Sequence, residues 1–235
     1  MPQTLLIADL HLISDESEKT NLFIKFCQEQ ATQANQLFIL GDLFNTWLGD
    51  DLSIDAYSSV ISVLKMLSKT TEIFITGGNR DFLLGDEFVK QTGCVLLKTP
   101  YLLETEYKDY VLIHGDELCT DDTNYQKLKS ILQHPVTKFI FLHLPTQTRL
   151  KLSGQLRNKS IEAQQYKTRE IMDVSQATTD KLMQKYPNAD LIHGHTHRQN
   201  IHIGGQYTRF VLGDWDTDKG NAIVIDKQLS HLEIR

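Results

Sequence analysis

The stretch LFILGDLFNTWLGDD, residues 37–51, contains the strongest local signal for the fold of this chain. Its first four residues are a continuous apolar run, which is typical of a buried β-strand. The run ends at Gly41 and Asp42, where glycine lets the chain turn and leaves room beside the carboxylate. An acid directly after a buried strand lies at the carboxyl edge of a sheet, where open α/β folds place their ligands. Taken alone, Asp42 has a simpler explanation as a turn residue or helix cap.

Two other apolar runs end in the same way, and helical patterns separate them. The apolar runs are residues 4–8 and 72–76, and the helical patterns cover residues 14–34 and 54–67. In residues 14–34 and 54–67, apolar side chains recur at helical spacing, which predicts amphipathic helices. Strands that alternate with helices are typical of a layered α/β core whose strands run parallel.

The second half of the chain has short strands and one long segment without β-alternation. Strands are expected at residues 95–97, 101–106, 110–114, 189–192, 201–203, 207–212, 222–225 and 229–234. The pair Gly204-Gly205 predicts a hairpin turn, and residues 175–185 have the pattern of a helix. Residues 123–168 are expected to form several helices, inserted into a single α/β domain that spans residues 1–235.

A chain of 235 residues can bury a sizeable core, and the composition is ordinary for a globular protein. The three cysteines, Cys27, Cys94 and Cys119, are scattered and odd in number, which favours a reducing compartment over a disulfide framework. The first residues lack the basic start and long apolar core of a signal peptide. No apolar run approaches the roughly 20 residues that cross a bilayer. These features predict a cytoplasmic protein.

Charge is distributed unevenly along the chain, although the formal net charge is only −6. Residues 125–169 contain nine Lys or Arg and one acid, a balance of +8, which leaves −14 for the rest. A basic segment in an acidic protein indicates an anionic partner, such as a phosphate ligand, a nucleic acid or a membrane surface. A solvated helical face explains the charge equally well. Aromatic residues are not interleaved with the basic ones as in single-strand binders, so no nucleic-acid partner is expected.

Five predicted strands end in side chains that can bind metals. These side chains are Asp9 and His11, Asp42, Asn79, His114, and His195 and His197. Carboxylates, an amide oxygen and imidazoles form a mixed ligand set suited to manganese, iron or zinc. Seven ligands exceed what one metal with an open position can use, so they predict two metals that share a carboxylate. Each residue alone has a simpler explanation, such as a turn for Asn79, and the joint pattern is what indicates a metal centre.

In this order, the motifs D-x-H, G-D, G-N-x-D, H-G and G-H-x-H resemble those of the calcineurin-like metallophosphoesterases. The resemblance covers nearly the whole chain except the basic segment, and it implies an α/β double-sheet sandwich flanked by helices. One metal is then held by Asp9, His11 and His197. The other is held by Asn79, His114 and His195, and Asp42 bridges the two. A hydroxide between the metals is the expected nucleophile.

Arg80 stands where many members of that family have histidine. Arginine stays charged at neutral pH and cannot exchange a proton, but its fork of donors pairs with phosphate oxygens. The difference therefore favours a leaving group that is already a stable anion, such as a phosphate, and indicates cleavage of a diphosphate. Asp42, Arg80 and His195 are the expected catalytic residues.

A narrower resemblance rests on G-N-R-D-F, G-D-L-F-x-x-W-x-G-D-D, H-G-D-E-L-C-T-D-D and the helical insertion. Together these features are similar to the UDP-2,3-diacylglucosamine hydrolase family of lipid A synthesis in Gram-negative bacteria. The resemblance implies manganese-dependent hydrolysis of that lipid's diphosphate to UMP and 2,3-diacylglucosamine 1-phosphate (lipid X), with two Mn²⁺ ions as cofactors. It also implies peripheral attachment to the cytoplasmic face of the inner membrane, and a helical cap that holds the acyl chains. A monomer is expected.

The same resemblance assigns substrate contacts to residues of this chain. They are Asn79, Arg80, Asp122, Ser160, Gln164, Lys167 and His195. Asn45 replaces an acid that is common in relatives, and no large effect of this change is expected. Asp81 is expected either to orient a metal ligand or to cap a helix. The apolar residues 139–142 lie among basic ones, which suits either an acyl-chain slot or a hairpin packed on the sandwich.

Two other functions stay open on the sequence alone. Another dimetal phosphodiesterase or nucleotide pyrophosphatase would use the same ligands, but a small soluble substrate needs no apolar, basic insertion. A non-catalytic scaffold of the same fold predicts lost ligands, and all seven are present in this chain.

Overall fold

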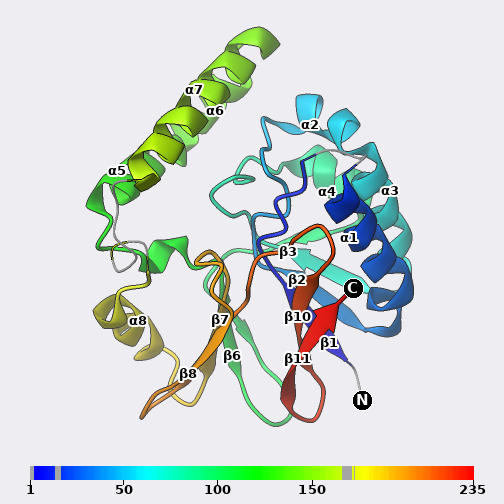
Figure 1. Cartoon of the computed structure of the whole chain (residues 1–235), viewed down its shortest axis with the longest axis vertical. Coiled ribbons are helices and arrows are strands. Elements are labelled where there is room, and N and C mark those ends of the chain that lie inside the picture. Colours follow the sequence, from blue (N-terminus) through cyan, green and yellow to red (C-terminus); the bar gives the residue numbers. More distant parts are fainter. Residues whose placement is uncertain (1–2, 14–16, 166–170, 172) are drawn as a thin grey trace.

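The computed structural model describes residues 3–13, 17–165, 171 and 173–235. Two β-sheets pack face to face, and helices cover the outer face of each sheet (Figure 1). One apolar cluster fills the space between the sheets, and another lies under the helices on each side. The expected α/β double-sheet sandwich flanked by helices is therefore confirmed.

The first sheet has six strands in the order β11-β10-β1-β2-β3-β4. The strands are β1 (Thr4–Ile7), β2 (Gln36–Ile39), β3 (Glu72–Ile75), β4 (Val95–Leu96), β10 (Gly220–Ile225) and β11 (Leu229–Ile234). β1, β2 and β3 run parallel, as expected, β4 also joins β3 parallel, and β10 joins β1 antiparallel. The helices on its outer side are α1 (Glu18–Glu29), α2 (Asp50–Ala56), α3 (Ser58–Leu67) and α4 (Asp86–Thr92), with a 3₁₀ turn η1 (Ala31–Gln33).

The second sheet has five strands in the order β5-β6-β7-β9-β8. The strands are β5 (Tyr101–Leu103), β6 (Tyr110–Ile113), β7 (Asp190–His193), β8 (Asn200–Ile203) and β9 (Thr208–Val211). β6, β7 and β9 run parallel, and the edge strands β5 and β8 are antiparallel to their neighbours. Helix α8 (Gln176–Met183) covers the outer face, and a 3₁₀ turn η2 (Asp116–Leu118) follows β6.

The continuous apolar run of β2 follows from burial on both of its faces. Leu37 and Ile39 pack under the helices, whereas Phe38 and Leu40 point between the sheets. Successive side chains of a strand point to opposite faces, so a strand in the middle of a layered fold needs apolar residues at every position. Phe38 stacks on Phe74 of β3 at a ring distance of 4.7 Å, which ties the two parallel strands together inside the sandwich.

Three further helices project from the sandwich at the upper left of Figure 1. They are α5 (Thr123–Leu132), α6 (Pro135–Leu142) and α7 (Thr146–Gln165), and they will be called the cap. The cap is fastened by Arg149, which is only 3% exposed, pairs with both carboxylate oxygens of Asp51 and donates to the Leu48 carbonyl at 2.9 Å. Within the described residues, no helix is both long and apolar enough to cross a bilayer.

Two helical expectations were wrong in detail. The single helix expected over residues 54–67 is two helices, because Tyr57 leaves the helical conformation at φ −123° and ψ 35°. Helix α4 was not expected, although Asp86 and Glu87 in its first turn and Gly93 at its left-handed end are helix signals. Of the helix expected over residues 14–34, residues 14–16 lie outside the described part, and Ser17 caps α1 by accepting from the Thr20 amide.

Candidate active site

The seven predicted ligands follow five parallel strands, three from the first sheet and two from the second. Asp9 and His11 follow β1, Asp42 follows β2, Asn79 follows β3, His114 follows β6, and His195 and His197 follow β7. Backbone hydrogen bonds join the loops within each sheet, from His11 N–H to the Asp42 carbonyl at 2.9 Å and from Gly194 N–H to the His114 carbonyl at 2.9 Å. The His195 amide donates to Asp9 Oδ2 at 2.7 Å, which joins the two sheets at the site.

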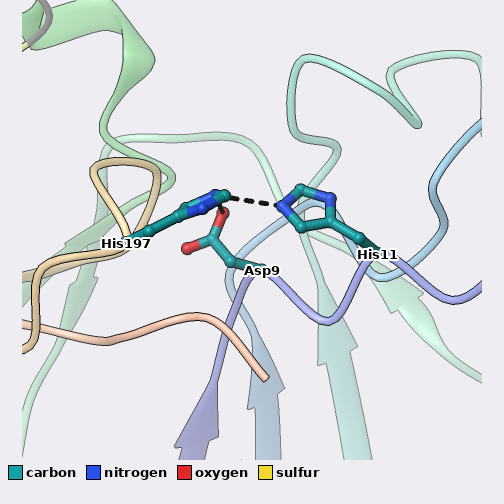
Figure 2. A group of neighbouring side chains, drawn as sticks. All are labelled: Asp9, His11 and His197. Atoms are coloured by element: carbon teal, nitrogen blue, oxygen red, sulfur yellow. Dashed lines mark hydrogen bonds and ion pairs between the residues drawn. The ribbon is translucent and has the colours of Figure 1, made fainter. Parts of the chain in front are cut away.

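The first group of ligand atoms belongs to Asp9, His11 and His197 (Figure 2). Nε2 of His11 lies 3.0 Å from Nε2 of His197, and Asp9 Oδ1 lies 3.6 Å from the same His197 nitrogen. One atom from each residue can be chosen so that all lie within 4.8 Å of one another. This is the first metal set that the sequence predicted, and its three side chains point toward one centre.

The second group is centred on His114. Its Nδ1 lies 2.8 Å from the Leu40 carbonyl, so Nδ1 carries the proton and Nε2 points toward Asn79 Oδ1 at 3.2 Å. The His195 ring lies 5.1 Å from the His114 ring, edge to face. One ligand atom each of His114, Asp42 and Asp9 can be chosen so that all three lie within 4.8 Å of one another. Asp9 therefore takes part in both groups, which the sequence did not predict.

Asp42 lies between the two groups. Its Oδ2 is 3.8 Å from His11 Nδ1 and 3.8 Å from His114 Nε2, one ligand of each predicted set. Its Oδ1 accepts a hydrogen bond from the Arg80 amide at 2.9 Å. This position is the one that a shared carboxylate needs.

The backbone is strained at these ligands. Among the described residues, the non-glycine residues with positive φ are Asp9, His11, Asp42, Asn188, His195 and His197, at 51° to 74°. Five of the six are predicted ligands. Left-handed backbone costs roughly 1–2 kcal/mol for a residue with a side chain, and such residues gather at functional sites. The sharp turns point paired side chains such as those of Asp9 and His11 toward one centre.

Two glycines make room for the carboxylates. A Cβ atom on Gly78 would overlap Asp42 Oδ1, and one on Gly194 would overlap Asp9 Oδ2. The loops after β3 and β7 can therefore approach the acids closely only because these positions have no side chain. The glycine in G-N-x-D and the one in G-H-x-H are parts of the site for this reason.

Burial sets the charge of the histidines. It lowers the pKa of His11 to about 2, and burial together with His114 lowers the pKa of His195 to about 3, so both rings are neutral and can offer lone pairs. Burial also raises the pKa of Asp42 to about 7. Burial alone would lower the pKa of His114, but the carboxylates of Asp42 and Asp116 raise it to about 10. The raised pKa of Asp42 shows that the site's own side chains do not fully compensate the charge of this acid.

The donor set fits divalent cations. Asp9 Oδ1 and His11 Nδ1 are buried and have no hydrogen-bond partner among the described residues. Such unpaired buried atoms are rare in folded proteins, and here both belong to the predicted ligands. Oxygen and imidazole donors of this kind bind Mn²⁺, Fe²⁺ or Zn²⁺, and the cations would also balance the buried carboxylates.

Asp81 holds the loop that carries Asp42. Its side chain is fully buried, and Oδ1 accepts from the Gly78 amide at 2.7 Å and the Asp42 amide at 3.2 Å. Oδ2 accepts from the Phe44 amide at 3.3 Å. Of the two roles expected, Asp81 therefore orients a ligand, and it does so through the backbone on both sides of Asp42. Helix capping is the wrong alternative, because the three amides belong to loops.

A cavity of about 270 Å³ lies between the sandwich and the cap, next to the ligands. Asn79, Arg80 and Ser160, three of the residues expected to contact substrate, line this cavity. Most of its wall is apolar, from Leu83 of the sandwich and from Leu128, Leu132, Phe141 and Leu156 of the cap.

The other expected contacts lie elsewhere. Asp122 is nearly buried and caps α5 by accepting from the Tyr125 amide at 3.1 Å. His195 stacks on the ring of Tyr125, which lines the cavity, at 6.2 Å. The side chain of Gln164 and all of Lys167 lie outside the described part of the chain.

Tyr125 is a residue of the site that sequence reasoning missed, and Asn45 is one that was expected to matter little. The Tyr125 hydroxyl donates to Asp116 Oδ2 at 2.5 Å, and Lys129 pairs with the same oxygen at 2.8 Å, so α5 is anchored to the turn after His114. Asn45 accepts hydrogen bonds from Arg80 and from Arg157 of the cap. In the sequence, only the acids at 116 and 117 and the lysines of α5 indicate that α5 contacts the turn after His114.

The fold and the ligand cluster define a class of protein. The model of the calcineurin-like phosphoesterase family matches residues 2–199, and the chain belongs to that family. Within it, the sequence is 42% identical to the UDP-2,3-diacylglucosamine hydrolase of Pseudomonas syringae pv. tomato over 229 residues, 95% of this chain and 92% of that protein. The protein of the same name from Haemophilus influenzae is 40% identical over 228 residues, 97% of this chain and 96% of that protein.

Proposed function

We propose that this chain hydrolyses the diphosphate of UDP-2,3-diacylglucosamine to UMP and 2,3-diacylglucosamine 1-phosphate, a step of lipid A synthesis. The apolar cavity beside the ligand cluster is the observation that carries the proposal. A phosphoesterase acting on a small soluble substrate needs no apolar wall, whereas a diacylated sugar nucleotide brings two acyl chains and a diphosphate. The near full-length similarity to hydrolases of that name supports the same substrate.

The ligand cluster would hold two divalent cations, and manganese is the proposed metal. The cations, when bound, would activate water and neutralise charge on the phosphate oxygens. Arg80, whose Nε lies 3.8 Å from Asp42 Oδ2, adds a positive charge beside the diphosphate. Since arginine holds its proton, the reaction needs a leaving group that departs as an anion, and a sugar phosphate meets that need. Asn79, which lines the cavity and whose Oδ1 lies 3.2 Å from His114 Nε2, is assigned to the same diphosphate.

The cap is proposed to receive the acyl chains. Residues 123–168 would form this insertion within one domain, with Phe141, Leu132 and Leu156 as the apolar wall. Ser160 lines the cavity on α7, and we assign it, with Asp122, Gln164, Lys167 and His195, to the glucosamine phosphate. Of the apolar residues 139–142, Phe141 lines the cavity and packs against the core of the sandwich, whereas Phe139 and Ile140 face solvent.

The activity can be tested by product analysis in ¹⁸O-water. Purified protein with Mn²⁺ is expected to release UMP from UDP-2,3-diacylglucosamine, and the label is expected in UMP, because the sugar phosphate is the leaving group. Mass spectrometry of both products measures this. Label in the lipid product would mean attack at the other phosphorus, and no UMP would remove the assignment. The chelator EDTA is the control and is expected to stop turnover.

The outer face of the cap is proposed to lie on the cytoplasmic face of the inner membrane. Ile131, Val136, Phe139 and Ile140 are 56% to 64% exposed there, in the segment that carries the basic excess. Apolar side chains among basic ones suit an anionic lipid surface. We also propose a monomer, since one chain contains the whole ligand cluster.

Binding to vesicles tests this attachment. The protein is expected to sediment with vesicles that contain anionic phospholipid, and each Lys or Arg at the surface contributes about 1 kcal/mol, so high salt should release it. The double variant Phe139→Ser and Ile140→Ser should bind at least about tenfold more weakly. Met66→Ser, an exposed apolar residue on α3, is the control. Binding that ignores anionic lipid and salt would contradict the proposal.

A further inference from the structure

Two arginines from different parts of the molecule meet on one side-chain oxygen. Nη1 of Arg80, in the loop after β3, donates to Asn45 Oδ1 at 2.9 Å. Nη2 of Arg157, on helix α7 of the cap, donates to the same oxygen at 3.0 Å. All three residues line the cavity. The guanidinium groups therefore converge at the place where the cap meets the sandwich.

The acceptor that joins these two cations is neutral. Arg157 has one further hydrogen bond, to Thr46 Oγ1 at 3.4 Å, and no acidic partner among the residues that the structure describes. Among the described acids, Arg80 contacts only Asp42, the predicted shared ligand, with 3.8 Å between Nε and Oδ2. Like charges repel, and water at the exposed Arg157 only reduces that repulsion, so an anion between the two guanidinium groups would stabilise both. Within the described residues, the pair of arginines therefore has one acidic neighbour, and that neighbour contacts Arg80 alone.

Other cations of the cap are arranged differently. Arg149 pairs with Asp51, and Lys129 pairs with Asp116 at 2.8 Å. Lys138 donates to the Phe82 carbonyl at 2.9 Å and lies over the Phe82 ring. Each of these three residues fastens the cap to the sandwich, whereas Arg157 lines the cavity and has no acidic partner in the described part of the chain. The difference indicates that Arg157 serves a ligand.

We propose that Arg157 and Arg80 together bind the second phosphate of the diphosphate, which is the leaving phosphate and not the one that is attacked beside the metals. Asn45 sets the spacing of the two guanidinium groups, because each gives it one N–H and keeps its other donors for phosphate oxygens. The inference rests on the proposed function and deepens it. Arg157 then selects diphosphates over single phosphodiesters, because a substrate with one phosphate leaves this place empty.

A comparison of two substrates tests the selection. Arg157→Gln is expected to lower kcat/KM for UDP-2,3-diacylglucosamine by about 10- to 100-fold, the usual effect of a lost charge-assisted hydrogen bond. The loss for bis(p-nitrophenyl) phosphate, which has one phosphate, should be at least tenfold smaller. A tenfold difference corresponds to about 1.4 kcal/mol. Lys159→Gln, also basic and exposed on α7 but outside the cavity, is the control and should change neither substrate. Equal losses for both substrates, or none, would overturn the proposal.

The shared acceptor gives a second, independent test. Asn45→Ala keeps both arginines but removes the oxygen that spaces them, so it should also impair the diphosphate substrate selectively. Calorimetric titration of the metal-free protein with inorganic diphosphate should show about 10- to 100-fold weaker binding in Arg157→Gln and Asn45→Ala. Unchanged binding in both variants would refute the proposal. If the wild-type protein releases no UMP, the proposed function fails, while the titration still decides whether Arg157 binds diphosphate.

Discussion

Replacing Asp42 by asparagine is expected to lower kcat/KM by about 10³-fold or more, since it removes a charge that both metal positions share. Asparagine has nearly the same shape and can still accept from the Arg80 amide through its oxygen, so the loops should keep their positions. The measurement is steady-state turnover of UDP-2,3-diacylglucosamine, with the bound metal counted by mass spectrometry. Asp218→Asn, at an exposed turn residue, is the control.

The same variant should not destabilise the metal-free protein. The folded-state pKa of Asp42 is raised by burial to about 7 from 3.8, so its ionised form disfavours folding increasingly as pH rises between these values. Asparagine has no charge to bury, and the Tm in EDTA at neutral pH should therefore be unchanged or higher. Activity near that of the wild-type protein would contradict a shared carboxylate at this position. A loss of activity no larger than the loss of folded protein would contradict it as well.

Replacing Asp81 by alanine is expected to damage both stability and activity. The change leaves the buried amides of Gly78, Asp42 and Phe44 without their acceptor. One such unmade hydrogen bond costs about 1–3 kcal/mol, so a loss of about 3–5 kcal/mol in the free energy of unfolding is expected. Because Asp42 would no longer be held, kcat/KM should also fall by about 10- to 100-fold, as for other residues that orient metal ligands.

Urea unfolding and turnover, measured on the same preparations, separate the two acids. Asp42→Asn should lose activity with its stability kept, whereas Asp81→Ala should lose both. Asp81→Asn lies between them, because one amide oxygen can replace Oδ1 while the NH₂ group faces the Phe44 amide. A fully stable and active Asp81→Ala protein would show that the hydrogen bonds from these three amides do not position Asp42.

The sheets and the ligand cluster could be predicted because their signals are local. An apolar run followed by an acid or histidine identifies a strand and its carboxyl end without knowledge of the rest of the chain. Parallel order then brings the strand ends of one sheet together. Asp9, His11 and Asp42 could thus be predicted to gather at one edge. The scattered cysteines and the alternation of strands with helices indicated only the general class of protein and not the site.

Contacts across the chain were beyond such reasoning. Asn45 and Arg157 are 112 residues apart, and their hydrogen bond depends on how the cap lies against the sandwich. The three amides bound by Asp81 likewise come from two loops that meet only in the folded protein. Asn45 was expected to matter little, and the structure places it at the junction of two arginines. The break at Tyr57 was missed because the apolar spacing continues through it.

The left-handed backbone at the ligands has a consequence for how this site can persist over time. Glycine would relieve about 1–2 kcal/mol at each such position, and a neutral side chain in place of Asp42 would relieve burial of a charge as well. Folding alone therefore favours loss of the ligands, one substitution at a time. A descendant released from selection for catalysis should drift toward a more stable protein of the same fold without its metals. All seven ligands are present in this chain, as catalysis with two metals would require.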